Sequence, residues 1–419
     1  GDALPMRIGI STSVMQRGQS GVGQYVLALV RALLGEAHRH DFILFVLEED
    51  LPLFGFAAAA MQLVPVAERF RPPLNNVLWH QLYLPRLARR LQLDVLHVPS
   101  YRRLLWPHPC ALVATLHDLA PFRVPGKYNL PRMLYGRTVV PWLARRQDEI
   151  ITVSQFTAAD ITTFLGLPRR RLRVIHNGLD HERFHPGSRT MAKTAVAHSH
   201  GVHQPFFLYV ARLEHPAKNH VRLINAFNRF KTETGSPWQL VLGGSIWRGA
   251  EVVQGLVRQS AFAADIHPLG FVADEELPML YRAADLFVFP SLFEGFGLPP
   301  IEAMACGCPV LSSTSGALGE VIGDAAAILD PESTTDIQTQ LTRLAGDIRA
   351  RNELRAKGLV RAALFDWRRT AAATLEAYAS AAAKNKRSPL VVRRAPPSWP
   401  ERTPRPSPWA SDEPLTPRS

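Results

Sequence analysis

Short apolar runs alternate with amphipathic segments along most of the chain. In the first half, five strand-length runs are continuously apolar, as expected of parallel strands buried on both faces: residues 7–12, 42–47, 95–99, 111–116 and 149–154. Between the first two lies residues 21–35, a segment with helical spacing of apolar residues and a glycine at each end. Strands that alternate with helices predict a parallel sheet with right-handed crossovers.

The same pattern starts again after a polar stretch at residues 186–204. Strands are predicted at 206–210, 238–244, 265–270, 285–290 and 308–313, and helices at 218–230, at 274–282 and from about 299. A chain of 419 residues is too long for one ordinary core. We therefore predict two α/β domains, residues 6–185 and 186–366, with a ligand cleft between them.

The last part of the chain changes in composition twice. An alanine-rich segment, residues 367–383, predicts a helix that we expect to pack back on the N-terminal domain. Residues 384–419 contain nine of the 34 prolines among serines and arginines. Such a composition cannot bury a core, so we predict a disordered tail.

Composition narrows the class of protein. Hydrophobic residues make up 47% and charged residues 20%, which is typical of a globular protein. No apolar run is long enough to span a bilayer, and the N-terminus lacks a secretion-signal pattern. Three cysteines argue against a disulfide framework and favour a cytoplasmic setting. Cys306 and Cys308 have the wrong spacing for zinc, so we expect them to pack at a helix end.

The formal net charge of +12 indicates an anionic partner: nucleic acid, a phosphate-bearing substrate or an acidic membrane face. Solubility alone is the alternative explanation. The sequence contains no helix-turn-helix, zinc or RNA-binding motif, which argues against nucleic acid.

Residues 285–307 read as a strand, a glycine-rich loop and a helix. Four successive residues would present backbone N–H groups to an anion such as a pyrophosphate at the helix N-terminus: Gly295, Phe296, Gly297 and Leu298. Glu294 and Glu302 flank this site, and carboxylates accept hydrogen bonds from sugar hydroxyls. The residues alone equally allow an ordinary loop glutamate and a partner of the helix dipole.

Two cations lie in a second block of interest. Arg212 follows a predicted strand, and Lys218 lies six residues later at the start of a helix. Converging cations can bind a diphosphate and stabilise the charge that develops on a leaving group. Two unrelated surface cations are the alternative.

Glu294, seven intervening residues and Glu302, preceded by Ala-Asp-Leu-Phe-Val-Phe-Pro-Ser, resemble the E-x7-E motif of retaining glycosyltransferases of family 4. The resemblance covers about residues 6–382. It implies the GT-B fold, in which two Rossmann-like α/β domains face each other across a cleft. It also implies a nucleotide-sugar donor and neither metal nor other cofactor. Glu294 would hold the donor sugar, Glu302 the ribose, and Arg212 with Lys218 the diphosphate.

Other site residues follow from the same resemblance. Gly21 and Gly23 resemble the glycine-rich loop that faces the donor phosphates; a dinucleotide fingerprint would need a third glycine where Val26 stands. His117 ends a predicted strand and resembles a family histidine near the reacting sugar, although a lone histidine is more often structural. Two further residues match the backbone that contacts the nucleobase in the family: Phe271 and Val272.

The wider pattern resembles bacterial members of the family that build surface polysaccharides, several of which transfer mannose from GDP-mannose. We expect this donor, with UDP-glucose, UDP-galactose or another nucleotide-sugar as alternatives. The acceptor would be a glycan or a polyprenyl-diphosphate-linked oligosaccharide. A GT-B epimerase would lack the block of Glu294 and Glu302. A non-enzymatic basic binding protein is the alternative from another class.

Four basic and aromatic stretches lie in the first half: residues 69–73, 101–106, 127–132 and 169–173. Arginine or lysine beside tryptophan, leucine and tyrosine can dock on an anionic bilayer. These stretches predict peripheral contact with the inner face of the cytoplasmic membrane, or else ordinary solvated helix faces.

Overall fold

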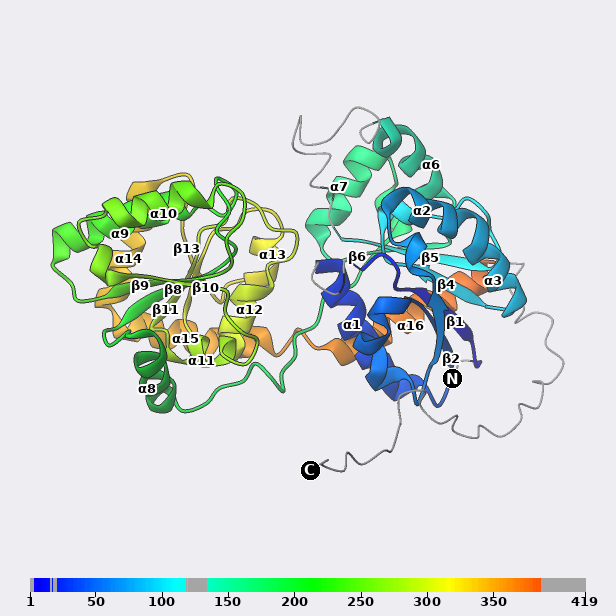
Figure 1. The fold of residues 1–419 in the computed structure, drawn as a ribbon. Coiled ribbons are helices and arrows are strands. Elements are labelled where there is room, and N and C mark those ends of the chain that lie inside the picture. Colours follow the sequence, from blue (N-terminus) through cyan, green and yellow to red (C-terminus); the bar gives the residue numbers. More distant parts are fainter. Residues whose placement is uncertain (1–3, 16, 18–20, 118, 120–133, 386–419) are drawn as a thin grey trace, which may run out of the picture.

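The computed structural model describes residues 4–15, 17, 21–117, 119 and 134–385. It has two lobes, each a parallel sheet with helices on both faces, and the predicted α/β GT-B architecture is confirmed (Figure 1). The predicted disordered tail lies outside the described residues, except for Lys384 and Asn385. Within the described ranges, no helix combines the length and apolarity required to cross a bilayer.

The first sheet has seven parallel strands in the order β3-β2-β1-β4-β5-β6-β7. Their bounds are β1 Arg7–Ser11, β2 Asp41–Leu47, β3 Gln62–Val66, β4 Val95–Val98, β5 Ala111–Leu116, β6 Glu149–Thr152 and β7 Leu172–Val174. In the central register, Ile8 of β1 lies opposite Phe42 of β2 and Val95 of β4. The strand order reverses between β1 and β4, which places a ligand crevice at the carboxyl ends of these strands.

Helices cover both faces of the first sheet. The α-helices are α1 Gly21–Leu33, α2 Pro73–Leu78, α3 Leu84–Arg90, α6 Val140–Arg145 and α7 Gln155–Leu165. The 3-10 helices are η1 Leu34–Glu36, η2 Glu48–Ala57, η3 Glu68–Phe70, η5 Tyr101–Arg103 and η7 Arg169–Arg171, and the π-helical segments are η4 Trp79–Tyr83 and η6 Tyr135–Val139. Ser154 begins α7 because its hydroxyl accepts from the Thr157 N–H at 3.0 Å, and Gly166 ends it with a φ of 65°.

The second sheet has six parallel strands in the order β10-β9-β8-β11-β12-β13. Their bounds are β8 Phe206–Val210, β9 Gln239–Gly243, β10 Ile266–Gly270, β11 Leu286–Phe289, β12 Val310–Ser312 and β13 Ala327–Ile328. The strand order repeats that of the first sheet, with the reversal between β8 and β11. The loops after these two strands therefore face the second crevice.

Helices also flank the second sheet. They are α8 Arg189–His200, α9 His220–Thr234, α10 Ala250–Gln259, η8 Ala263–Asp265, α11 Leu277–Ala283, α12 Leu298–Ala305, α13 Leu318–Ile322, α14 Thr334–Gly346 and α15 Ile348–Ala362. Helix α8 lies inside the polar stretch 186–204, where the sequence pattern predicted none. Ser188 caps it, and Ala192 and Val196, one turn apart, suffice to attach it to the core.

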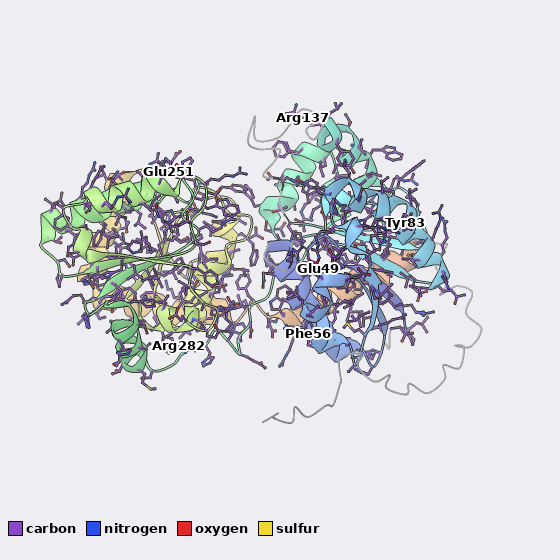
Figure 2. All side chains as sticks on the ribbon, viewed as in Figure 1. Glu49, Phe56, Tyr83, Arg137, Glu251 and Arg282 are labelled. Carbon is purple, nitrogen blue, oxygen red and sulfur yellow. The ribbon has the colours of Figure 1, made fainter. Side chains whose placement is uncertain are left out.

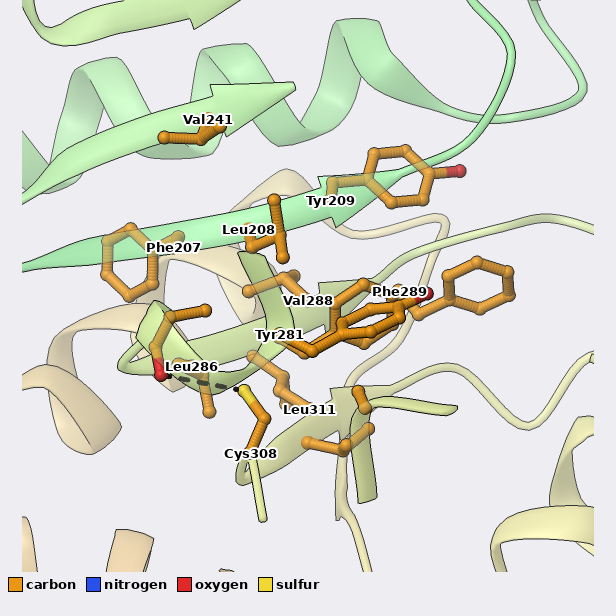
Figure 3. Close-up of a cluster of buried hydrophobic side chains, with 14 of the residues drawn as sticks. Phe207, Leu208, Tyr209, Val241, Tyr281, Leu286, Val288, Phe289, Cys308 and Leu311 are labelled. Carbon is orange, nitrogen blue, oxygen red and sulfur yellow. Dashed lines mark hydrogen bonds between the residues drawn. The ribbon is translucent and has the colours of Figure 1, made fainter. Parts of the chain in front are cut away.

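The second domain is built around one continuous apolar core. Strands β8 and β11 supply Phe207, Tyr209 and Phe289 to it (Figure 3). Cys308 lies in the same cluster, with its Sγ 3.7 Å from the Ala284 carbonyl oxygen. Cys306 and Cys308 are buried free thiols at the end of α12, and burial raises the pKa of each to about 12. Both therefore act as packing residues.

The final helix, α16 Trp367–Lys384, leaves the second lobe and lies against the first sheet (Figure 1). Tyr378 is buried in the first core, and the Lys384 Nζ lies 2.6 Å from Glu149 Oε1 of β6. The two connections between lobes run side by side, since the Leu179 N–H donates to the Phe365 carbonyl at 3.2 Å. Gly178 is required there because a Cβ would lie 2.3 Å from the backbone nitrogen of Trp367.

Candidate active site

Lys218 and Glu294 meet at the carboxyl edge of the second sheet. The Lys218 Nζ lies 2.5 Å from Glu294 Oε1, and Ser291 Oγ donates to the same oxygen at 2.9 Å. Lys218 lies between β8 and α9, and Glu294 lies between β11 and α12, so two neighbouring parallel strands deliver the pair. The side chains are 18% and 17% exposed, which leaves the ion pair accessible to a ligand.

Hydrogen bonds hold the two loops against each other. The Leu292 N–H donates to the Ala217 carbonyl at 3.2 Å. The Asn219 Nδ2 donates to the carbonyls of Pro290 at 2.9 Å and Pro331 at 2.7 Å. Asn219 has a φ of 63°, a left-handed conformation that asparagine tolerates better than most residues. Asparagine after Lys218 thus supplies both the backbone conformation and an amide that binds the neighbouring loops.

Two glycines shape the loop of Glu294. Gly316 has a φ of 63°, and a Cβ there would lie 2.4 Å from the Glu294 carbonyl oxygen, which accepts from the Ala317 N–H at 3.0 Å. Gly297 precedes α12 with a φ of 87°, and a Cβ there would lie 2.4 Å from Leu318 Cδ2. Side chains at either position would displace the loop.

The predicted anion site, residues 295–298, lies at the N-terminus of α12. The Phe296 side chain is buried and points towards the inter-lobe connection, with ring centroids 6.0 Å from His176 and 5.9 Å from Phe365. Only the backbone of Phe296 is therefore suited to a phosphate contact.

The Arg212 side chain contacts an aromatic ring and a nearby acid. Its guanidinium lies 4.6 Å from the centroid of Trp247 and 3.5 Å from Glu214 Oε2, and its side chain is 51% exposed. The segment that leads to Trp247 passes close to the backbone before Arg212 because residue 244 is glycine: its φ is 144°, and a Cβ there would lie 1.9 Å from the Ala211 carbonyl oxygen. Sequence reasoning missed Trp247; its only signal was an aromatic residue closely after the glycines that end β9.

Glu302 lies in a different environment from Glu294. Its Oε2 accepts from the Tyr281 hydroxyl at 2.9 Å. Removal from water raises the pKa of Glu302 to about 7, and Tyr281 and Arg183 oppose that shift only in part. One predicted carboxylate is therefore ion-paired, whereas the other titrates near neutral pH.

His117 follows β5 of the first domain. Its ring meets that of Tyr25 edge to face at 4.5 Å, and burial lowers the pKa of His117 to about 4, so the imidazole is neutral at pH 7. Its Nε2 is buried without a hydrogen-bond partner among the described residues. A neutral imidazole nitrogen in this state can bind a sugar hydroxyl.

The remaining predicted residues lie at the start of helix α1 and just after strand β10. Gly21 is the exposed first residue of α1, with no described atom near a hypothetical Cβ, and Gly23, two residues later, is buried. Phe271 is 76% exposed just after β10, and Val272 packs on the core beside Gly243.

Across the residues that the structure places, no group of three or more His, Cys, Asp and Glu could hold a metal ion.

Comparison with known proteins gives consistent matches. Residues 19–183 match the family described as glycosyltransferase family 4, and residues 193–359 match glycosyl transferases group 1. O-antigen chain mannosyltransferase B of Escherichia coli is 30% identical over 394 residues, 89% of this chain and 99% of the relative. Serotype-specific mannosyltransferase WbdA of Escherichia coli is 30% identical over 278 residues, which are 64% of this chain but only 33% of that protein.

Solved structures share the fold. A glycosyltransferase from Rickettsia africae ESF-5 superposes with a TM-score of 0.72 at 15% identity and covers 90% of this chain and 98% of its own. Anabaena Alr3699/HepE, solved with UDP and glucose, superposes with a TM-score of 0.69 at 19% identity and covers 88% of this chain and 98% of its own.

Proposed function

Because this chain belongs to glycosyltransferase family 4, we propose that it transfers mannose from GDP-mannose to a glycan acceptor in surface-polysaccharide synthesis. The observation that carries the proposal is the convergence of Lys218 and Glu294 beside the N-terminus of α12. The choice of mannose is supported by the likeness to an O-antigen chain mannosyltransferase along nearly the whole length of that relative.

The Lys218–Glu294 ion pair suggests how the enzyme binds the diphosphate and the sugar of the donor. When the donor binds, the Lys218 ammonium leaves Glu294 and pairs with the diphosphate oxygens. Glu294 can then accept hydrogen bonds from the sugar hydroxyls. Arg212 and the backbone N–H groups at the start of α12 add positive potential. Negative charge on the leaving diphosphate is therefore stabilised as it develops.

The transfer proceeds with retention. The bond from the sugar C1 to the phosphate oxygen breaks while the acceptor hydroxyl attacks C1 from the same face. The departing phosphate oxygen takes the hydroxyl proton, so the protein contributes orientation and charge stabilisation. His117, neutral and with an unoccupied Nε2, binds a hydroxyl of the donor sugar from the first domain.

A donor screen tests the substrate. GDP-mannose should raise the melting temperature more than UDP-glucose, UDP-galactose or dTDP-glucose, because a ligand that binds the native state stabilises it by mass action. Release of GDP in the presence of an acceptor glycan should follow the same order. Stabilisation by a UDP-sugar with no response to GDP-mannose would contradict the mannose proposal and leave the glycosyltransferase assignment in place.

We also propose that the first domain docks on an anionic membrane. Leu74, Leu78 and Leu82 recur at helical spacing along α2 and η4, with 81%, 52% and 48% exposure. The Trp106 and Trp142 rings continue this apolar surface, 6.3 Å apart and both exposed. Gln81 attaches the Trp106 segment to η4, because its Nε2 donates to the Leu104 carbonyl at 2.7 Å and its Oε1 accepts from the Trp106 N–H at 2.9 Å.

The charge of this region favours acidic lipid headgroups. Residues 73–147 contain eleven Lys and Arg but only two acidic residues, Asp94 and Asp118, and Asp94 is buried. Tyr83 and Arg137, both labelled in Figure 2, belong to this region of the first domain. Of the four basic stretches noted in the sequence, residues 127–132 lie outside the described residues.

Flotation with vesicles tests the docking surface. The protein should float with phosphatidylglycerol-containing vesicles, and a Leu78→Ser, Trp106→Ser variant should float less. Leu364→Ser, at a half-exposed leucine of the second domain, is the matched control. No flotation of the wild type at low salt would remove the membrane proposal.

A further inference from the structure

Glu320 of the second domain reaches across to the first. Its Oε1 accepts from the Gln155 N–H at 2.8 Å and its Oε2 from the Phe156 N–H at 3.2 Å. These are the first two residues of α7, whose N–H groups have no partner within the helix. The His176 Nε2 lies 2.6 Å from Glu320 Oε1. One carboxylate therefore binds a helix N-terminus and an imidazole of the other domain.

The electrostatics favour this arrangement. A negative charge at a helix N-terminus is stabilised by the helix dipole. Partial burial works against ionisation of Glu320, but hydrogen bonds from His176, Gln155 and Phe156 hold its pKa below the usual value. The carboxylate is thus ionised in the pH range in which the enzyme would work.

The same first-domain residues contact the loop of Glu294. The Phe156 ring lies 5.9 Å from Phe293, and the His176 ring lies 6.0 Å from Phe296. Phe293 precedes Glu294 and Phe296 follows it by two residues. The position of the Glu294 loop therefore depends on where the first domain lies relative to the second.

Glu320 is itself firmly attached to the second domain. Arg361 of α15 donates to the carbonyls of Glu320 at 2.6 Å and Val321 at 2.8 Å. Helix α13, which carries Glu320, lies on the side of the second lobe that faces α7 (Figure 1). Glu320 is therefore fixed to the rest of the second domain through Arg361.

We propose that Glu320 is a positioning residue that clamps the two domains together and so sets the Glu294 loop in its transfer geometry. This inference rests on the proposed role of Glu294. Loss of the clamp lets the domains separate, removes Phe156 and His176 from both sides of Glu294, and slows transfer because the reacting groups are no longer aligned.

The test combines kinetics with small-angle X-ray scattering of the full chain. Glu320→Gln should lower kcat by about 10- to 100-fold, as expected for a small misplacement of reacting groups, and should increase the radius of gyration. Glu320→Asp keeps the charge and should restore part of both quantities. Glu251→Gln is the matched control, at an exposed acid in the first turn of α10, labelled in Figure 2. It should leave both quantities unchanged.

His176→Gln provides a second variant, needed if Glu320→Gln fails to fold. It removes one partner of the carboxylate and should open the domains less than Glu320→Gln. Wild-type scattering in folded Glu320→Gln or in His176→Gln would overturn the clamp, whether or not kcat falls. If Glu294→Ala retained turnover, the proposed function would fail, whereas the scattering result would still decide whether Glu320 joins the domains.

Discussion

The two domains share one strand order but differ in the polar groups that their central strands and neighbouring loops carry. The second presents the Lys218–Glu294 ion pair and a carboxylate, Glu302, whose pKa is raised to about 7. The first has a neutral network that is fully buried, in which His97 Nδ1 lies 2.7 Å from the Tyr378 hydroxyl and His97 Nε2 lies 2.7 Å from Thr115 Oγ1. Burial lowers the pKa of His97 to about 3.

This difference follows from the surroundings of each set of polar groups. A diphosphate carries several charges, so its site needs cations, and those cations need a carboxylate to balance them when no donor is bound. The network of the first domain lies inside the core, where neutral hydrogen-bonding groups satisfy one another without the cost of burying charge. The cores differ as well: the second is continuous, whereas the first divides into three clusters, one of which α16 completes.

The largest expected effect tests whether the charged crevice performs the chemistry. Lys218→Ala or Glu294→Ala should lower turnover by about 10³-fold, since each removes charge stabilisation or donor orientation in the transition state. The measurement is nucleotide release under saturating donor, with circular dichroism to verify the fold. Lys193→Ala is the control because Lys193 forms a pair with Asp285, 2.9 Å apart, outside the crevice. Near-normal turnover in either site variant would refute the assignment.

The next prediction is that burial of Glu302 makes the free energy of unfolding depend on pH. Its folded pKa of about 7 exceeds the unfolded value of about 4.3. Between these values the folded state keeps a proton that the unfolded state has lost, so the free energy of unfolding should fall as pH rises. Below both values the two states are equally protonated, and above both the loss is complete.

Relative to Glu302→Gln, the wild type should therefore lose on the order of 2 kcal/mol of stability between pH 5 and pH 8. Urea unfolding of both proteins at the two pH values measures this difference. A constant difference between them would show that Glu302 is ionised throughout this pH range.

The smallest effect tests the buried neutral network of the first domain. Tyr378→Phe deletes the hydroxyl that binds His97 and leaves a buried nitrogen without that partner, so it should cost about 1–2 kcal/mol of unfolding free energy. Tyr83→Phe, at an exposed tyrosine of the same domain, should change stability little. Equal stability of the two variants in urea unfolding would mean that the contact of α16 with His97 does not stabilise the first domain.

Much of the framework could be predicted from local pattern. Continuous apolar runs marked ten strands correctly because burial on both faces leaves a direct trace in the sequence. Several elements left a weaker trace, among them strands β3, β7 and β13 and helix α8. Strand β3 contains Pro65 and lies at the sheet edge, β13 has only two residues, and α8 shows only two buried apolar side chains.

The sequence by itself determined the two parallel sheets, the glycine-rich loops and the residue types at the crevice, because strand period, turn chemistry and motif spacing are local properties. Only the tertiary structure decided that Lys218 binds a carboxylate 76 positions away, that Arg212 lies on Trp247, and that Glu320 binds the other domain. Those pairings depend on how distant loops pack, which no local pattern records.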